Sequence, residues 1–342
     1  MALLECVPNV SEGRDQARLD RLVAAAAVEG VRPLDRSSDP DHHRAVLTWV
    51  GEAAPLIEAA CRLCHRALDE IDLRTHRGAH PRLGAVDVVP FVPLLGTPMA
   101  LAVETARAAG AAIAERCGLP VMLYEAAASD PTRRDLARHR RGGLAALSAR
   151  MTNGEWPPDF GPSTPHPTAG VVCVGARVPL VAFNVLLDTA EVETAREIAR
   201  RIRAATPGGL SGVKAIGLYL ESRGCAQVSV NLVDCQRTTL GALVRRVRDE
   251  ARALGARVST TELVGLAPLG SVLDAAAAEL LLPGLEERQI LESRLLDPNE
   301  TPHEPPSARS SRRGRSSKEP DDMTTSTSPG RAVSSAMRKT SS

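Results

Sequence analysis

The chain is organised around residues 74–93, Arg74-Thr-His-Arg-Gly-Ala-His-Pro-Arg-Leu-Gly-Ala-Val-Asp-Val-Val-Pro-Phe-Val-Pro93. From residue 85 onward this stretch is mostly branched and apolar, which is typical of a buried strand. Before it, Gly78 frees the backbone, while Pro81 disfavours helix at His80 and presets the bend that follows. We therefore expect a rigid turn that presents the imidazole of His80 where a sheet strand begins.

Around this stretch, the first half of the chain alternates between strand and helix patterns. The expected elements are a short strand that runs into a polar turn over 5–13, helix at 14–28, strands at 32–37 and 44–50, helix at 53–71, strand at 86–94, helix at 97–117 and strand at 119–125. The order β-α-β-β-α-β, with an added α-β, is that of a ferredoxin-like unit. Residues 129–170 are looser, with an arginine-rich helix and a proline-rich loop.

The second half repeats the same order. We expect a strand at 170–187, helix at 191–204, strands at 213–221 and 226–233, helix at 238–254 and strand at 256–264. A helical stretch at 270–296 follows. The predicted fold is α/β (α+β), with two ferredoxin-like βαββαβ subdomains of mostly antiparallel sheets and helices on one face. The predicted boundaries are 1–169, 170–297 and a disordered tail at 298–342, which is nearly free of apolar residues.

Composition excludes several classes of function. The chain has 342 residues, of which 43% are hydrophobic but 2% aromatic, so its cores must be aliphatic. The net charge is +1, and eight basic against five acidic residues lie from 298 onward, so the body carries about −2 (+1 minus +3) and has no nucleic-acid footprint. Seven scattered cysteines behind a start without a signal sequence favour reduced thiols in the cytoplasm. No run is long enough to cross a membrane.

Two metal-related patterns have simpler interpretations. Cys61-Arg-Leu-Cys64-His65 matches a haem attachment signature, but both thiols fall on the apolar stripe of an amphipathic helix, so we expect them in the core. His76 and His80 have a spacing that could bind zinc on a helix, yet Gly78 and Pro81 oppose helix there. We therefore expect no metal site.

Polar residues mark two further candidate sites. His80 could transfer protons near neutral pH or could merely satisfy a turn carbonyl, and its crowding by His76, Arg77, Arg82 and Asp87 favours function. Asn9, Ser11 and Glu12 follow a strand end, where ligands gather in open sheets, although Ser11 could simply cap the next helix.

Several stretches together resemble the glutamate formimidoyltransferase (formiminotransferase) family. In order along residues 3–296 they are Glu5 to Gly13, His80 to Phe91, Asp159 to Pro162, Ala182 to Asn184, Val213 to Gly217, Ala226 to Ser229 and Leu263 to Leu266. The resemblance implies a transferase of one-carbon metabolism and histidine degradation. It would move the formimino group of N-formimino-L-glutamate to nitrogen-5 of tetrahydrofolate, its co-substrate, without a metal.

The resemblance also implies site residues and partners. His80 would be the general acid and base. By the logic of a catalytic triad, Asp39 (or Asp35) is the candidate that orients His80, although both could be ordinary loop aspartates. Because both substrates carry carboxylates, Arg44, Arg82 and Arg177 are candidates to hold them, although each could equally be a surface residue. Asn9 and Asn184 are further candidates for substrate binding. The folate-binding loop would include Asp159, Phe160, Gly161, Pro162, Ser163, Thr164, His166 and Thr168. We expect a homodimer in the cytoplasm, and a separate cyclodeaminase acting downstream.

The sequence departs from the family pattern at His43 and Leu186, which leaves details of the pocket open. Two other functions remain as alternatives. One is conversion of 5-formyltetrahydrofolate on the same fold, although the chain lacks the phosphate-binding motif that an ATP-driven reaction would favour. The other is a folate-binding module without catalysis, because ferredoxin-like pairs often serve as sensors.

Overall fold

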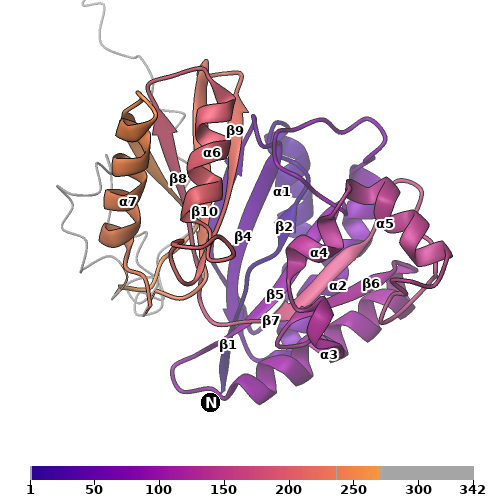
Figure 1. Ribbon diagram of the computed structural model, residues 1–342. Coiled ribbons are helices and arrows are strands. Elements are labelled where there is room, and N and C mark those ends of the chain that lie inside the picture. Colours follow the sequence, from indigo (N-terminus) through magenta and orange to yellow (C-terminus); the bar gives the residue numbers. More distant parts are fainter. Residues whose placement is uncertain (1, 236, 270, 272–342) are drawn as a thin grey trace, which may run out of the picture. The chain divides into compact units, whose positions relative to one another are not determined.

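The computed structural model describes residues 2–235, 237–269 and 271, whose strands form two separate sheets (Figure 1). The helical stretch expected at 270–296, apart from residue 271, and the tail expected at 298–342 lie outside the described residues. In the described part, no helix is both long and apolar enough to cross a membrane.

The first sheet has seven strands. They are β1 (Leu3–Cys6), β2 (Asn9–Val10), β3 (Val31–Asp39), β4 (Arg44–Gly51), β5 (Val86–Leu94), β6 (Val121–Glu125) and β7 (Val172–Ala176). β1 and β2 run in succession between β4 and β5 and are antiparallel to both. β3 pairs with the outer edge of β4, and β7 is parallel to both β5 and β6. The sheet is therefore a ferredoxin-like unit that is extended by two parallel strands.

Small side chains let the helices approach this sheet closely. α1 (Gln16–Ala25), α2 (Ala53–Glu70) and α3 (Met99–Cys117) pack on one face. The core holds Ala59 and Ala60 of α2 and Ala102 and Ala106 of α3, all completely buried. Cys61 and Cys64 belong to the same core, so their interpretation as packing residues is confirmed.

A second group of helices covers the opposite face at the β5–β7–β6 end. It consists of the short helix η1 (Pro131–Arg133), α4 (Leu136–Arg140) and α5 (Gly143–Thr152). Leu147 and Met151 of α5 pack against Met122 and Cys173. The sequence predicted helices on one face only, and this holds for part of the sheet. The second group of helices brings the end of α4 close to β5.

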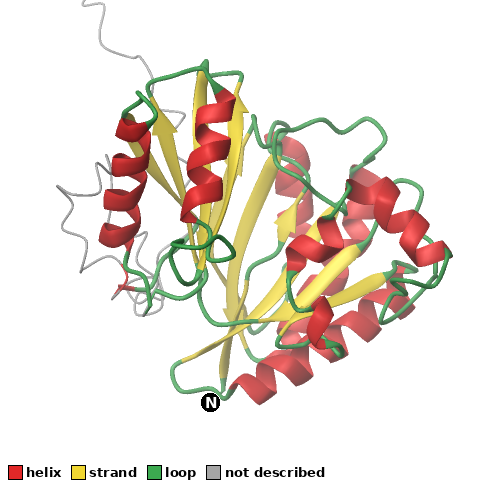
Figure 2. Ribbon diagram, in the orientation of Figure 1, coloured by secondary structure: helices red, strands yellow, loops and turns green. Residues whose placement is uncertain are grey.

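The second sheet consists of β8 (Val181–Leu187), β9 (Val213–Leu220), β10 (Cys225–Leu232) and β11 (Val258–Val264). Its order is β11-β8-β10-β9 with every pair antiparallel, which is the expected ferredoxin-like arrangement. Figure 2 shows α6 (Val192–Ile202) and α7 (Leu240–Ala253) on one face of these strands, where their apolar side chains form the core. Asn184 and Gln227 alternate with that core and point to the other face, yet both are buried.

One expected element is wrong. The strand predicted from 170 to 187 is two strands, because β7 pairs in the first sheet and β8 in the second. The residues between them include Pro179, whose missing N–H cannot join a sheet ladder. The division of the subdomains at 169/170 stays a prediction, and the change of sheet favours a division between 176 and 181.

Candidate active site

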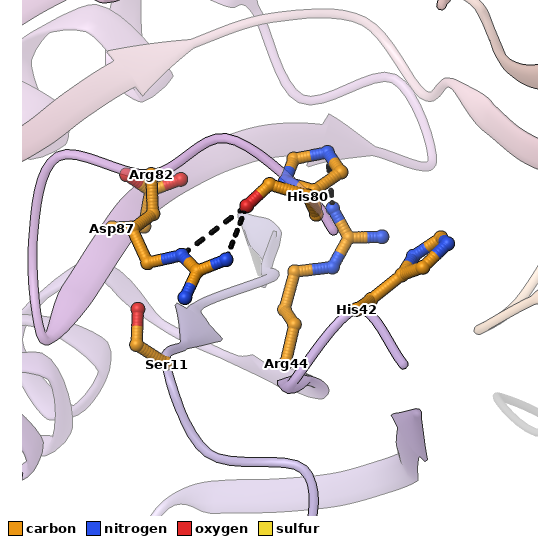
Figure 3. Close-up of a pocket in the computed structure, with 6 residues that line it drawn as sticks. All are labelled: Ser11, His42, Arg44, His80, Arg82 and Asp87. Carbon is orange, nitrogen blue, oxygen red and sulfur yellow. Dashed lines mark hydrogen bonds between the residues drawn. The ribbon is translucent and has the colours of Figure 1, made fainter. Parts of the chain in front are cut away.

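A small cavity lies where β2, β4 and β5 converge. Figure 3 shows the six side chains that line it, which are Ser11, His42, Arg44, His80, Arg82 and Asp87. They come from the end of β2, the β3–β4 loop, the first residue of β4, the turn before β5 and β5 itself. The site therefore draws on segments that antiparallel pairing brings together.

Hydrogen bonds from the side chains of Arg82 and Asp87 hold the turn before β5 in place. Asp87 accepts a hydrogen bond of 2.6 Å from the backbone N–H of Leu83. The Arg82 guanidinium donates to the carbonyls of Gly78, at 2.8 Å, and of His80, at 3.2 Å. A Cβ at Gly78 would lie 2.4 Å from the carbonyl oxygen of His42, so only glycine fits. These contacts confirm the rigid turn predicted from the sequence.

One ring nitrogen of His80 is held by a guanidinium. Arg44 Nη1 lies 2.9 Å from Nε2, and because a guanidinium only donates, Nε2 must be the unprotonated acceptor. The proton of the neutral ring is therefore on Nδ1. His80 is 8% exposed. Burial, with Arg44, Arg140 and His42 nearby, holds its pKa well below the ordinary value, so it is neutral at pH 7.

Positive charge exceeds negative charge around the cavity. Asp87 forms a buried ion pair with Arg140 at the end of α4. Arg44 has no such partner within 4 Å in the described part of the chain, and burial together with Arg140 lowers its pKa to about 10. Carboxylates are the partners that guanidinium groups prefer. The cavity is thus suited to an anionic ligand.

The loop between β3 and β4 also forms hydrogen bonds with β10 and with the turn between β9 and β10. His42 Nε2 lies 2.9 Å from Gln227 Oε1, and both side chains are buried. The amide nitrogen of Gln227 has no hydrogen-bond partner among the described residues. Asp41 accepts hydrogen bonds from the N–H and the hydroxyl of Ser222. The His42 and His80 rings are 5.8 Å apart, so Gln227 reaches the site through His42.

Sequence reasoning missed Arg140 and Gln227 as site residues, and it noted Asp87 only as a neighbour of His80. For Gln227 a signal existed, because in Ala226-Gln-Val-Ser-Val230 the polar residues alternate with the core residues of a strand. Arg140 carried no comparable signal, since it lies 53 positions from Asp87 in an arginine-rich stretch.

Asp39 contacts the loop beside His80 rather than the His80 ring. It accepts a 2.7 Å hydrogen bond from the backbone N–H of His42, whereas Arg44 is the residue bonded to His80. Asp39 thus shapes the β3–β4 loop, and a direct part in catalysis stays a prediction. The alternative role for Ser11 is wrong, because Asp15 caps α1 while the Ser11 hydroxyl donates to the carbonyl of Gly84.

The remaining predicted residues near β2 and β8 lie outside the lining of the cavity. Asn9 donates to the carbonyl of Val7 at 3.1 Å. Arg177 donates to the carbonyl of Val178, also at 3.1 Å. Asn184 is 3% exposed within the second sheet. Their expected contacts with substrate stay predictions.

The loop predicted to bind folate is held at both ends. Asp159 accepts from the N–H of Leu123 at 2.8 Å, and Phe160 packs against the core. At the far end the His166 ring accepts from the N–H of Ala169 at 3.1 Å. Residues 161–164 between these anchors are exposed.

Nearby, the Trp156 indole donates to His139 Nδ1 at 3.0 Å, and the guanidinium groups of Arg133 and Arg150 lie 5.2 Å from its ring.

The histidine pair considered for zinc has other contacts. His76 stacks on His43, with ring centroids 4.0 Å apart, and its Nε2 bonds the carbonyl of His43 at 3.0 Å. Residues 76–80 are not helical. Among the described residues, no three His, Cys, Asp or Glu side chains are grouped in a way that could hold a metal ion.

Comparison with known proteins agrees with this arrangement. Residues 3–177 match the model of the formiminotransferase domain's N-terminal subdomain, and residues 182–290 match that of the formiminotransferase domain. The glutamate formimidoyltransferase of Streptococcus pyogenes serotype M1 is 43% identical over 86% of this chain and 99% of its own length. That of Thermoplasma acidophilum is 41% identical over 86% and 98%. The formimidoyltransferase-cyclodeaminase of Rattus norvegicus is 42% identical over 80% of this chain, which spans 52% of that protein. The chain belongs to the formiminotransferase family.

Proposed function

We propose that the protein transfers the formimino group from N-formimino-L-glutamate to nitrogen-5 of tetrahydrofolate and releases L-glutamate. The observation that carries this proposal is a buried, neutral histidine bonded to a guanidinium, in a chain that covers 99% of a relative named glutamate formimidoyltransferase. Such a cavity suits a donor with carboxylates and a reaction that moves protons.

The chemistry requires one proton to change nitrogens. Nitrogen-5 attacks the amidine carbon, forming a carbon–nitrogen bond and a tetrahedral intermediate. That intermediate then expels the amino group of glutamate, which must gain a proton as nitrogen-5 loses one. His80, which is neutral at pH 7, accepts the first proton and returns it to the leaving amine. General acid–base catalysis contributes about 10²–10⁴ in rate, and alignment of the two substrates supplies much of the rest.

The depressed pKa of His80 makes a directional prediction within this mechanism. Only the neutral imidazole can act as the initial base, so kcat/KM should fall where the free protein protonates His80. Because burial and nearby cations lower its pKa, that fall should lie below pH 6.5, the ordinary value.

The decisive assay measures glutamate release with formiminoglutamate and tetrahydrofolate, singly and together. Release only with both supports the transferase. Release without folate would indicate a hydrolase. Tight folate binding without turnover would favour the binding module. Parallel reactions with 5-formyltetrahydrofolate and ATP test the other alternative.

Assembly and metabolic context are parts of the same proposal. We infer a homodimer that works in the cytoplasm, as the family resemblance implies. The rat and mouse relatives are named formimidoyltransferase-cyclodeaminase. A cyclodeaminase would consume the product made here. Sedimentation equilibrium tests the dimer, and a coupled assay with such an enzyme tests the product.

A further inference from the structure

We propose that Arg44 occupies the Nε2 lone pair of His80 in the free protein. A carboxylate of the bound donor then draws the Arg44 guanidinium away, which frees this lone pair for catalysis. This inference rests on the proposed function. It makes Arg44 a gate that selects carboxylate-bearing donors.

The need for a gate follows from the hydrogen bonds of His80. A general base needs a free lone pair, and imidazole offers only one when neutral. That lone pair, on Nε2, accepts from Arg44 Nη1 at 2.9 Å (Figure 3). As it stands, His80 cannot take a proton. Arg44 has to leave before nitrogen-5 can be deprotonated.

The Arg44 guanidinium is poised to move to an anion. It is half-buried, and it donates to the neutral ring of His80 rather than to a carboxylate of the described residues. The nearest carboxylates have other partners, since Asp87 pairs with Arg140 and Asp39 accepts from the backbone of His42. A bidentate bond to a carboxylate is much stronger than one bond to imidazole. Binding of a carboxylate would therefore favour the displaced position of Arg44.

His80 reports the position of Arg44 through its titration. The titratable and charged groups around the ring are Arg44 of β4, Arg140 of α4, His42 of the β3–β4 loop, and Arg82 and Asp87 beside the turn. Of these, Arg44 is the one that bonds the titrating nitrogen. Moving Arg44 onto an added anion removes a cation from Nε2 and brings in a negative charge. Both changes raise the pKa of His80.

The test is an NMR titration of histidine ring resonances with and without glutarate, a dicarboxylate probe without a formimino group. In the wild-type protein, saturating glutarate should raise the pKa of His80 by about one unit or more. In Arg44→Met the pKa should already be high and should not respond to glutarate. Arg14→Met, which removes an exposed cation from the same region, should keep the wild-type response.

A kinetic arm uses formamidine, a formimino donor without carboxylates. Glutarate should accelerate its reaction with tetrahydrofolate several-fold in the wild type and not in Arg44→Met. An unchanged His80 pKa in the wild type with bound glutarate, or an equal rise in Arg44→Met, would overturn the gate. The wild-type arm decides even if the variant fails to fold. Because the titration needs no turnover, its result stands apart from failure of the proposed transfer reaction.

Discussion

Replacing Asp87 by Asn should cost the protein about 3 kcal/mol of unfolding free energy, as the loss of one half of a buried ion pair. Asp87 and Arg140 have side chains that are 4% and 19% exposed, so loss of the carboxylate leaves a buried cation without a partner. Breaking a buried ion pair from one side costs about 3–5 kcal/mol, and the residual exposure of Arg140 places this case at the lower end. Asn can still accept from the N–H of Leu83, so the change isolates the charge.

Two companion variants separate the contributions. Asp87→Ala also leaves the Leu83 N–H unsatisfied and should cost about 1–2 kcal/mol more. Asp87→Asn combined with Arg140→Met should recover part of the loss, because the unpaired cation is gone. The matched control is Glu193→Gln, which breaks an exposed pair with Arg196 and should leave the unfolding midpoint unchanged.

Urea unfolding followed by circular dichroism measures all four variants. A loss below about 1 kcal/mol in Asp87→Asn would refute the reasoning, because it would mean that solvent compensates Arg140. Equal losses in Asp87→Asn and Glu193→Gln would refute it as well, since burial would then make no difference to the pair.

Three further predictions concern other parts of the chain. His80→Asn should lower turnover by about 10² or more and leave the Kd of tetrahydrofolate within a few-fold; retained turnover would make the imidazole structural. Burial raises the pKa of Glu5 to about 7 from an ordinary 4.5, although the charge of Arg177 opposes this shift. The contribution of Glu5 to the free energy of unfolding is therefore complete below pH 4.5 and is lost as pH rises through 7. Wild type should thus lose roughly 3 kcal/mol relative to Glu5→Gln between about pH 4 and 8 in urea titrations, and parallel pH profiles would contradict this. Deleting residues 298–342 should leave the melting temperature and turnover intact, because that segment has little apolar surface; a large fall in melting temperature would show that it docks.

Periodicity predicted most of the fold. The strand at 86–94 and the helices at 53–71 and 97–117 were found within two residues at each end, because each has a regular apolar pattern. The strand at 170–187 failed, since β7 and β8 are both apolar and mostly buried runs, and composition does not reveal which sheet a run joins.

The candidate site was predictable where its residues share one segment. Glycine and proline indicated the turn that carries His80 and Arg82. Contacts between distant segments gave no such signal. Asp87 meets Arg140, and His42 meets Gln227 at a separation of 185 residues, through tertiary packing that no local pattern encodes.

The hydrogen bond between Trp156 and His139 gives this protein a built-in fluorescent reporter. The chain has two tryptophans, and Trp49 lies in the first core at 4% exposure. A Trp49→Phe variant would therefore emit from position 156 alone, beside the loop at 159–168. Nε2 of His139 bonds the carbonyl of Arg133 and Nδ1 accepts from the indole, while burial lowers the pKa of His139. The burial and both hydrogen bonds favour the neutral ring. Changes in emission at neutral pH would therefore report ligands arriving at the loop.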